Sequence, residues 1–517
     1  MTPKLYLYAN AQSIALLEEP AEKILLVGSD FGYGNFGDIL QHTNSISFHH
    51  GLGRFRTVSI MAVNAIGDRN FPEFVRTAYS CDAVVFVSEF PLDLTELKLP
   101  LKPIPSIRNA SALHLYGGGF LNEKWGDFVL GVTEYLLRTL RISTYVVSGQ
   151  QITRPYESRV VQHVDSCRPI LFGVRDSLSQ QWLDEAGYRA DFSFDDAIEA
   201  LHSLSVMLPV RRGNGLLLHL NVSDYTDNEV DDAALLAELE MVAAHGSSRY
   251  GATVLQAYAD QRSEVSDSRE AIKVLERAFP FYDYRLMELT ALAYQPAKIL
   301  QSSLHGELGY SCSYHVALWL QLAGIPCWLR GSNSFYQQKT AALQVHQDLN
   351  SFLRDPYLAD HSTNLERRAQ WQEALEEVLL DAPESSFVCE LSQPEKSAGL
   401  LFHFKGTPTL LQRAEAAEIL LQKCDAEQRG LREQNLALNA QLTEVGAIAH
   451  DYRLRAEEVE QLRAHTLAVE REVEQLRAQT LALEQRADSL FASKSWKVTR
   501  PLRDISRAFS RFIGKNN

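Results

Sequence analysis

The chain has 517 residues, of which 45% are hydrophobic and 22% charged, and it carries a formal net charge of −15. This composition is ordinary for a globular protein, and the length predicts two or three domains rather than one core. The negative charge argues against a nucleic-acid-binding protein, because affinity for polyanions comes from clustered Lys and Arg.

The cysteines and the N-terminal sequence indicate the compartment. The six cysteines are dispersed and form no Cys-x-x-Cys pair, which is typical of free thiols in a reducing environment. No HExxH or comparable metal-binding spacing is present, so we expect no metal site and no resident cofactor. The N-terminus has no signal-peptide pattern, and no window reaches about 18 apolar residues. We therefore expect a cytoplasmic protein.

Short apolar runs separated by helix-sized stretches make up most of the chain. The run KILLV at 23–27 enters a glycine-rich turn, and a second series of runs follows RRGNG at 211–215. Alternating strands and helices are typical of parallel sheets covered by helices. The prediction is an α/β fold with two Rossmann-like, GT-B-like lobes around a cleft, at residues 20–208 and 209–383.

A linker and a long coiled coil are predicted after the lobes, at residues 384–409 and 410–492. VEQLRAHTLAVERE, which starts at Val459, is followed by VEQLRAQTLALEQR from Val473, a spacing of two heptads. The a and d positions of this repeat are mostly apolar, but some hold Thr or Ala, which bury little surface. We expect two or three copies of the chain to associate here, and a single helix docked on the globular body is the alternative. The a and d residues are Val459, Leu462, Thr466, Val469, Val473, Leu476, Thr480, Leu483, Ala487 and Leu490.

The last segment, residues 493–517, is a basic amphipathic tail. It holds seven Lys and Arg against one acidic residue, Asp504. Apolar residues from Leu502 to Ile513 fall on one helical face between arginines, and Trp496 precedes them. Such a helix can lie peripherally on an anionic membrane, and docking on a partner chain is the alternative.

A glycine-rich loop, GSDFGYGNFGD at 28–38, joins the first predicted strand to its helix. Glycines allow backbone amides to approach a ligand, and a helix N-terminus favours phosphate or carboxylate. The spacing matches neither GxGxxG nor a Walker A loop, which indicates neither a dinucleotide nor a nucleoside-triphosphate site. A tight turn without a ligand is the alternative.

At this loop the chain resembles a known family. GYGNFGD resembles the G-x-G-N-x-G-D signature of the polysaccharide pyruvyltransferase family. Further elements are similar to family segments and follow in the family's order, and Asp195 and Asp196 lie where an acidic residue ends the family's first lobe. The resemblance covers roughly residues 20 to 345. The further elements are LYGGGFL at 115–121, GQQITRP at 149–155, VRDSLSQQWLDEAG at 174–187, SYHVALWLQLAGIP at 313–326 and NSFYQQK at 333–339.

The resemblance implies a reaction and a set of residues. Family members transfer the enolpyruvyl unit of phosphoenolpyruvate to two neighbouring sugar hydroxyls, which gives a ketal and phosphate. The resemblance implies that Arg175 binds an anion and that His315 acts as the acid or base. His305 competes for that role, but the family's spacing to the following glycine favours His315. The implied substrate-binding residues are Gly34, Asn35, Gly37, Asp38, Gly118, Gly119, Gln150, Ser313, Tyr336 and Lys339.

Ser313 departs from the family's pattern, which has Arg at this position. A charge-assisted contact contributes about 1.5 to 3 kcal/mol, so its loss weakens donor binding unless another cation replaces it. Arg154, Arg330 and Lys339 are the candidates for that replacement.

Two other functions stay open. One is glycosyl transfer in surface-polysaccharide synthesis by a GT-B-type enzyme, with Asp38 or His315 as the base. The tail string SKSWKVTRPLR at 493–503 resembles the ends of bacterial glycosyltransferases of such pathways. The other is a non-catalytic subunit that binds glycans. All three imply a glycan acceptor, self-association, and contact of the tail with the inner membrane face or with other glycan-synthesis enzymes.

Overall fold

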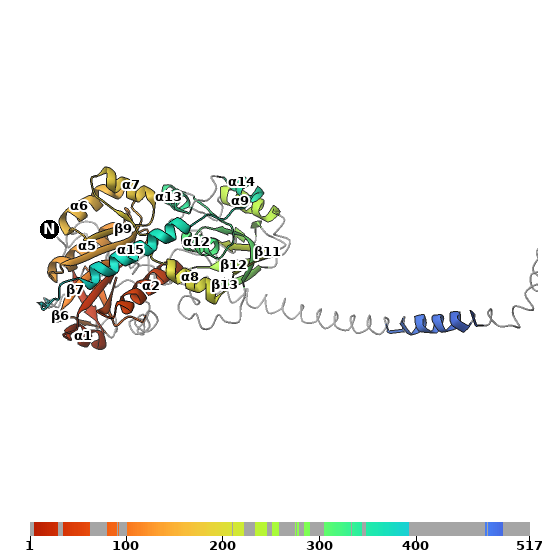
Figure 1. Ribbon diagram of the computed structural model, residues 1–517, viewed down its shortest axis with the longest axis horizontal. Helices are drawn as coiled ribbons and strands as arrows, with labels where there is room; N and C mark the ends of the chain where they lie inside the picture. Colours follow the sequence, from red (N-terminus) through yellow and green to blue (C-terminus); the bar gives the residue numbers. More distant parts are fainter. Residues whose placement is uncertain are drawn as a thin grey trace, which may run out of the picture. The chain divides into compact units, whose positions relative to one another are not determined.

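The structure is a computed structural model that divides into two compact units, Met1–Leu401 and Phe402–Asn517. The first unit contains two α/β lobes (Figure 1). The residues described are 5–28, 35–62, 80–89, 91–92, 101–208, 210–221, 233–245, 251–257, 274–275, 277–278, 284–289, 304–331, 333–343, 348–391, 471–472, 474–486 and 488–489.

The sheet of the first lobe has the strand order β10-β9-β8-β7-β2-β3-β4-β1-β5 in the described part of the chain. Neighbouring strands from β10 to β4 pair in parallel, and β1 pairs antiparallel with both β4 and β5. The central strands are buried throughout, because a sheet covered on both faces needs continuous apolar runs. The strands are β1 Tyr6–Ala9, β2 Lys23–Val27, β3 Arg56–Ala62, β4 Ala83–Ser88, β5 Lys102–Pro103, β7 Ala110–Leu115, β8 Thr144–Gln150, β9 Leu171–Val174 and β10 Asp191–Phe192.

Helices pack on this sheet over two apolar clusters, whereas the apolar residues of α8 belong to a third cluster shared with the second lobe. α1 and β1 lie before residue 20, where the sequence analysis places the start of the lobe, and β1 extends its sheet. The helices of this part are α1 Ala11–Glu18, α2 Phe36–Leu52, α5 Gly126–Thr139, η2 Arg154–Tyr156, α6 Glu157–Cys167, α7 Ser177–Glu185 and α8 Ile198–Met207.

The second lobe has a smaller sheet, ordered β13-β12-β11-β14-β15 in the described residues, and every pairing is parallel. Helices α2, α8 and α12 contact one another where the two lobes meet. The predicted two-lobe, GT-B-like α/β fold with parallel sheets is therefore confirmed. The elements are β11 Val210–His219, α9 Ala233–Ala244, β12 Ala252–Gln256, β13 Tyr284–Glu288, β14 Leu304–Ser311, α12 Tyr314–Leu322, β15 Cys327–Leu329, α13 Ser334–Ala342 and α14 Leu349–Arg354.

After the second sheet the chain returns to the first lobe. α15 (Ser362–Leu380) lies across that lobe and buries Leu375 and Leu379 in its core (Figure 1). Within the range expected to be a linker, β16 (Val388–Glu390) pairs antiparallel with β6 (Ser106–Arg108). The first lobe is thus completed by residues that follow the second lobe in sequence.

The coiled-coil prediction falls largely outside the described residues. Residues 471–472, 474–486 and 488–489 are helical and exposed, and Leu476 and Leu483 of the predicted seam are 55% and 66% exposed. The basic tail at 493–517 also lies outside the described residues. Among the residues the structure describes, no helix is long and apolar enough to cross a membrane.

Candidate functional site

The candidate site centres on Asp195, which follows the short strand β10 at the carboxyl end of the parallel sheet. Its side chain is fully buried and accepts hydrogen bonds from Arg175 Nη1 at 3.1 Å and Gln41 Nε2 at 3.1 Å. The backbone N–H of Ala197 donates to the same carboxylate at 2.9 Å. The three donors come from β9–α7, α2 and the start of α8, so Asp195 joins segments far apart in sequence.

His315 lies in the first turn of α12 and faces this carboxylate from the second lobe. Its Nε2 is 3.3 Å from Asp195 Oδ1 and 3.1 Å from Gln41 Nε2, and the residue is 9% exposed. Burial alone would raise the pKa of Asp195, but His315 and Arg175 outweigh it and hold that pKa well below its usual range. Asp195 therefore stays ionised, as a carboxylate that orients a histidine must.

Gly37 provides the link to the glycine-rich loop. A Cβ at this position would lie 1.8 Å from His315 Nδ1, so only glycine permits the approach. The sequence predicts that Arg175, His315 and the loop lie together. The loop reaches this site at Gly37, whereas Gly34 lies outside the described residues. Asn35 caps α2, and its Oδ1 accepts from Gly37 N–H at 3.0 Å.

Asp38 and Lys339 carry shifted pKa values in the same place. Burial raises the pKa of Asp38 to about 8; Asp195 adds to this shift, whereas Lys339 and Arg175 oppose it. Burial, with Arg175, lowers the pKa of Lys339 well below its usual range, against the pull of the two carboxyls. Asp38 is consequently protonated at neutral pH while Asp195 is ionised. Carboxyls whose pKa values differ in this way fit the roles of proton donor and ionised partner, which favours His315 over Asp38 as the predicted base.

Arg175 is held by protein groups on several sides. It donates to Asp195 and to Gln151 Oε1, and its guanidinium lies 4.5 Å from the ring centroid of Tyr314. Lys339 lies over the rings of Phe335 at 4.0 Å and Tyr336 at 4.5 Å. Both basic groups predicted to bind an anion are therefore fixed by neighbouring side chains.

The triple-glycine turn supports the site through close packing. A Cβ at Gly118 would lie 2.9 Å from the amide of Gln41, and one at Gly119 would lie 2.8 Å from Phe335. Gln150 is fully buried, and its Nε2 donates to Tyr116 O at 3.1 Å. These glycines allow side chains of the site to lie directly on the backbone.

The remaining sequence candidates lie in different places. Ser313 precedes α12 and donates through its N–H to Ser311 Oγ at 2.9 Å, whereas His305 is exposed at the opposite end of β14. Arg154 pairs with Glu157 and Glu185 on the surface. Arg330 lies 3.3 Å from Glu238 in α9. Of the three cations considered as replacements for the family's Arg, Lys339 is the one beside the Asp195 cluster.

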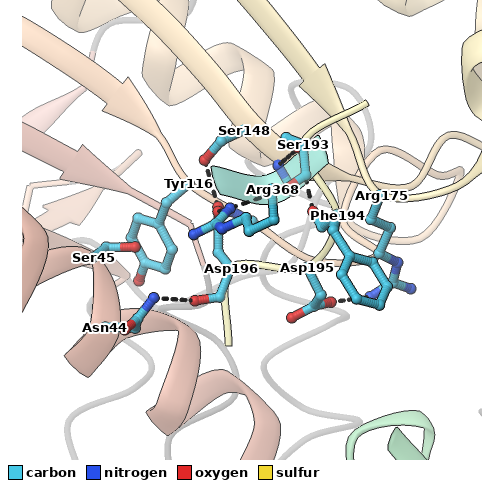
Figure 2. Close-up of polar contacts among 12 residues, drawn as sticks. Asn44, Ser45, Tyr116, Ser148, Arg175, Ser193, Phe194, Asp195, Asp196 and Arg368 are labelled. Carbon is cyan, nitrogen blue, oxygen red and sulfur yellow. Dashed lines mark hydrogen bonds and ion pairs between the residues drawn. The ribbon is translucent and has the colours of Figure 1, made fainter. Parts of the chain in front are cut away.

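Sequence reasoning did not assign roles to Gln41, Asp195, Asp196 or Arg368. Arg368 Nη1 lies 2.6 Å from Asp196 Oδ1, and Asp196 Oδ2 accepts from Gly117 N–H at 2.8 Å. Figure 2 shows Asp195 facing Arg175 while Asp196 faces Arg368. The available signal was the Asp-Asp pair shortly after the short strand β10, because side chains at the carboxyl ends of parallel strands meet at one edge.

In the part of the chain that the structure describes, one group with metal-ligating side chains lies outside this site. Glu134, His163 and Cys167 hold their ligand atoms within 4.8 Å of one another. His163 is hydrogen-bonded to Glu134 at 2.9 Å and to Tyr145 Oη at 2.8 Å, and burial raises the pKa of Cys167 to about 11. Hydrogen bonding accounts for this group without an ion.

No protein-family model and no curated protein matches the chain. Several solved structures are similar to this chain. One is a UDP-GlcNAc 2-epimerase from Neisseria meningitidis bound to UDP-GlcNAc, which is 10% identical and has a TM-score of 0.40. The similarity covers 69% of this chain and 99% of that chain. An α-glucosyltransferase in complex with UDP and DNA is 12% identical, with a TM-score of 0.35 and coverage of 71% and 97%. A spinosyn rhamnosyltransferase is 10% identical, with a TM-score of 0.31 and coverage of 70% and 97%. Similarity of this degree assigns neither a substrate nor a reaction to the chain.

Proposed function

We propose that the chain is a transferase that moves a group from an anionic donor to a hydroxyl of a surface glycan or its precursor. The observation that carries the proposal is the His315–Asp195 dyad, a histidine 3.3 Å from a buried, ionised carboxylate where the two lobes meet. A histidine oriented in this way suits removal of a hydroxyl proton, because the carboxylate stabilises the imidazolium that forms.

The dyad leaves one nitrogen for the substrate. We assign His315 the tautomer with its proton on Nε2, directed at Asp195, so that Gln41 Nε2 donates to Asp195 alone; Nδ1 then accepts the proton of the acceptor hydroxyl. A Cβ at position 37 would lie 1.8 Å from this atom, so only glycine lets the loop backbone approach Nδ1 this closely. An anionic donor beside Lys339 raises the pKa of that amine and so favours its charged form.

Glycosyl transfer from a nucleotide-sugar is the first candidate function. Arg175 is already engaged by Asp195 and Gln151, and Ser313 offers a neutral hydroxyl where the pyruvyltransferase pattern has a cation. This limits the charge available for phosphoenolpyruvate, which needs its carboxylate and its phosphate bound together. In glycosyl transfer the acceptor oxygen bonds to the anomeric carbon, the bond from that carbon to the phosphate oxygen breaks, His315 takes the hydroxyl proton, and the nucleoside diphosphate leaves.

Pyruvyl transfer is the second candidate, and the protonated Asp38 favours it. Ketal formation from phosphoenolpyruvate requires a proton on the methylene carbon, and a carboxyl with a pKa of about 8 holds one at neutral pH. Two acceptor oxygens then bond to the central carbon while its bond to the phosphate oxygen breaks. One hydroxyl proton replaces the one that Asp38 gave to the methyl group, and the other leaves with phosphate.

The test measures both donor classes with the full-length protein and an oligosaccharide mixture as acceptor. Release of nucleoside diphosphate supports the first reading, and release of phosphate from phosphoenolpyruvate supports the second. His315→Gln is expected to lower either rate by about 10²- to 10⁴-fold, as loss of a general base does. His305→Gln is the matched control and keeps the wild-type rate. A protein that neither turns over nor is thermally stabilised by any donor is a binding subunit, and the transferase proposal is then wrong.

A further inference from the structure

Helix α15 and His361, the residue before it, contact the two segments that carry the halves of the dyad, although they follow both in sequence. His361, the residue before its first turn, places Nε2 2.7 Å from Gln321 Oε1 on α12, the helix that carries His315. Arg368 is seven residues further on and binds Asp196, the residue after Asp195. One short stretch of helix is thus joined to each side of the His315–Asp195 contact.

Arg368 is fixed more firmly than an ordinary surface arginine. It is 6% exposed, and its Nε and Nη2 donate to the two carboxylate oxygens of Glu199 at 2.8 and 3.1 Å. Its Nη1 reaches Asp196 at 2.6 Å and the carbonyl of Ser193 at 3.1 Å. Forked contacts of this kind fix orientation as well as charge. Arg368 therefore contacts residues on both sides of Asp195, through the backbone carbonyl of Ser193 and the side chain of Asp196 (Figure 2).

The segment that Arg368 holds has an unfavourable backbone conformation. Phe194 has a φ of 55°, in the left-handed region that costs a non-glycine residue about 1 kcal/mol. Its ring is fully buried and lies 6.0 Å from the ring of His361, centroid to centroid. Contacts with α15 thus stabilise the conformation that aims Asp195 at the second lobe.

The spacing on α15 sets a fixed length between the two contacts. Seven helical residues rise about 10 Å, and a helix does not stretch to accommodate movement at either end. Leu375 and Leu379 anchor its later turns in the core of the first lobe, so movement of α12 away from Asp196 must break either the His361 or the Arg368 contact.

We propose that α15 positions the dyad, with Arg368 and His361 as positioning residues that set the distance between Asp195 and His315. This rests on the proposed function in taking His315 as the base, but the geometry it concerns can be measured without turnover. Neither residue needs to touch a substrate.

The test is the rate at which diethyl pyrocarbonate modifies His315 in the full-length protein at pH 7, followed by mass spectrometry. Exposed His305 provides the internal reference, and His163, which is fully buried and hydrogen-bonded to Tyr145 and Glu134, reports on folding. In Arg368→Met and His361→Phe, we expect His315 to react roughly threefold faster or more relative to His305, because local opening exposes it. Phe at position 361 keeps a ring against Phe194 but cannot bond Gln321.

Two variants serve as controls. Arg368→Lys keeps a cation for Asp196 and is expected to restore most of the protection lost in Arg368→Met. Arg367→Met removes the neighbouring arginine of α15, which stacks on Phe192 and donates to Gln180, and is expected to leave His315 unchanged. If His163 becomes reactive in Arg368→Met, that variant is misfolded, and the result for His361→Phe then tests the proposal.

Unchanged His315 reactivity in His361→Phe and in every folded Arg368 variant overturns the proposal. An equal increase in Arg367→Met also overturns it, because a general loosening of α15 then explains the effect. Where turnover is measured, the positioning role requires kcat to fall while KM holds. Wild-type turnover in His315→Gln would remove the proposed base, yet the labelling result would still report on the positioning.

Discussion

Replacement of Asp38 by Asn tests the electrostatic description of the site. The pKa of Asp38 is 3.8 in an ordinary environment and about 8 in the folded protein. Between about pH 4 and pH 8 the folded protein therefore keeps a proton that the unfolded chain has released. The stabilisation is full below about pH 4 and is lost as pH rises toward 8. A shift of about four pH units corresponds to roughly 5 to 6 kcal/mol, and the partial exposure of Asp38 reduces the expected effect to about 2 to 3 kcal/mol.

Asn cannot titrate, so the variant lacks this dependence. We expect the free energy of unfolding of Asp38→Asn, relative to wild type, to rise by about 1 to 2 kcal/mol between pH 5 and pH 8, which covers about two thirds of the full change. Urea denaturation followed by circular dichroism at the two pH values and constant ionic strength measures this difference. Asp184→Asn, which removes an exposed carboxyl on α7 away from the site, is the matched control. A constant difference between Asp38→Asn and wild type at both pH values would refute the raised pKa and the role of Asp38 as a proton donor.

Three further predictions concern other parts of the chain. Arg168→Gly is expected to raise the free energy of unfolding by about 0.5 to 1 kcal/mol in the same urea assay, because this exposed residue ends α6 with a φ of 48°; a destabilised variant would contradict this. Light scattering is expected to find two or three copies for the full-length protein and one copy for a chain ending at Leu401, and a monomeric full-length protein would exclude the coiled-coil interface. Full-length protein is expected to float with liposomes of anionic phospholipid more than a chain ending at Leu490, and equal flotation would exclude the tail as the membrane contact.

The two-lobe fold could be predicted because its central strands are buried on both faces. KILLV at 23–27 and AVVFVS at 83–88 are continuous apolar runs, as such strands require. The edge elements could not be predicted in this way. β1 and β16 are four and three residues long, and their partners are chosen by tertiary contact rather than by local pattern.

The site was predictable where one short motif contains the residues. Asp38 and Gly37 belong to the glycine-rich loop, and the spacing to Gly324 favoured His315. Gln41 and Asp195 are 154 positions apart, and Asp196 and Arg368 are 172 apart. Arg368 lies in a helix whose many charged residues, taken from sequence alone, predict exposure to solvent. Neither its burial nor its carboxylate partners follow from any local pattern, because the whole fold determines both.

The return of α15 and β16 to the first lobe has a consequence for biosynthesis. Leu375, Leu379 and Cys389 complete apolar clusters whose other members are encoded much earlier in the chain. Domains commonly fold in order as they leave the ribosome. Here the N-terminal lobe cannot close its core until residue 389 has emerged, so it must wait, partly uncovered, while the lobe encoded between its two parts is translated.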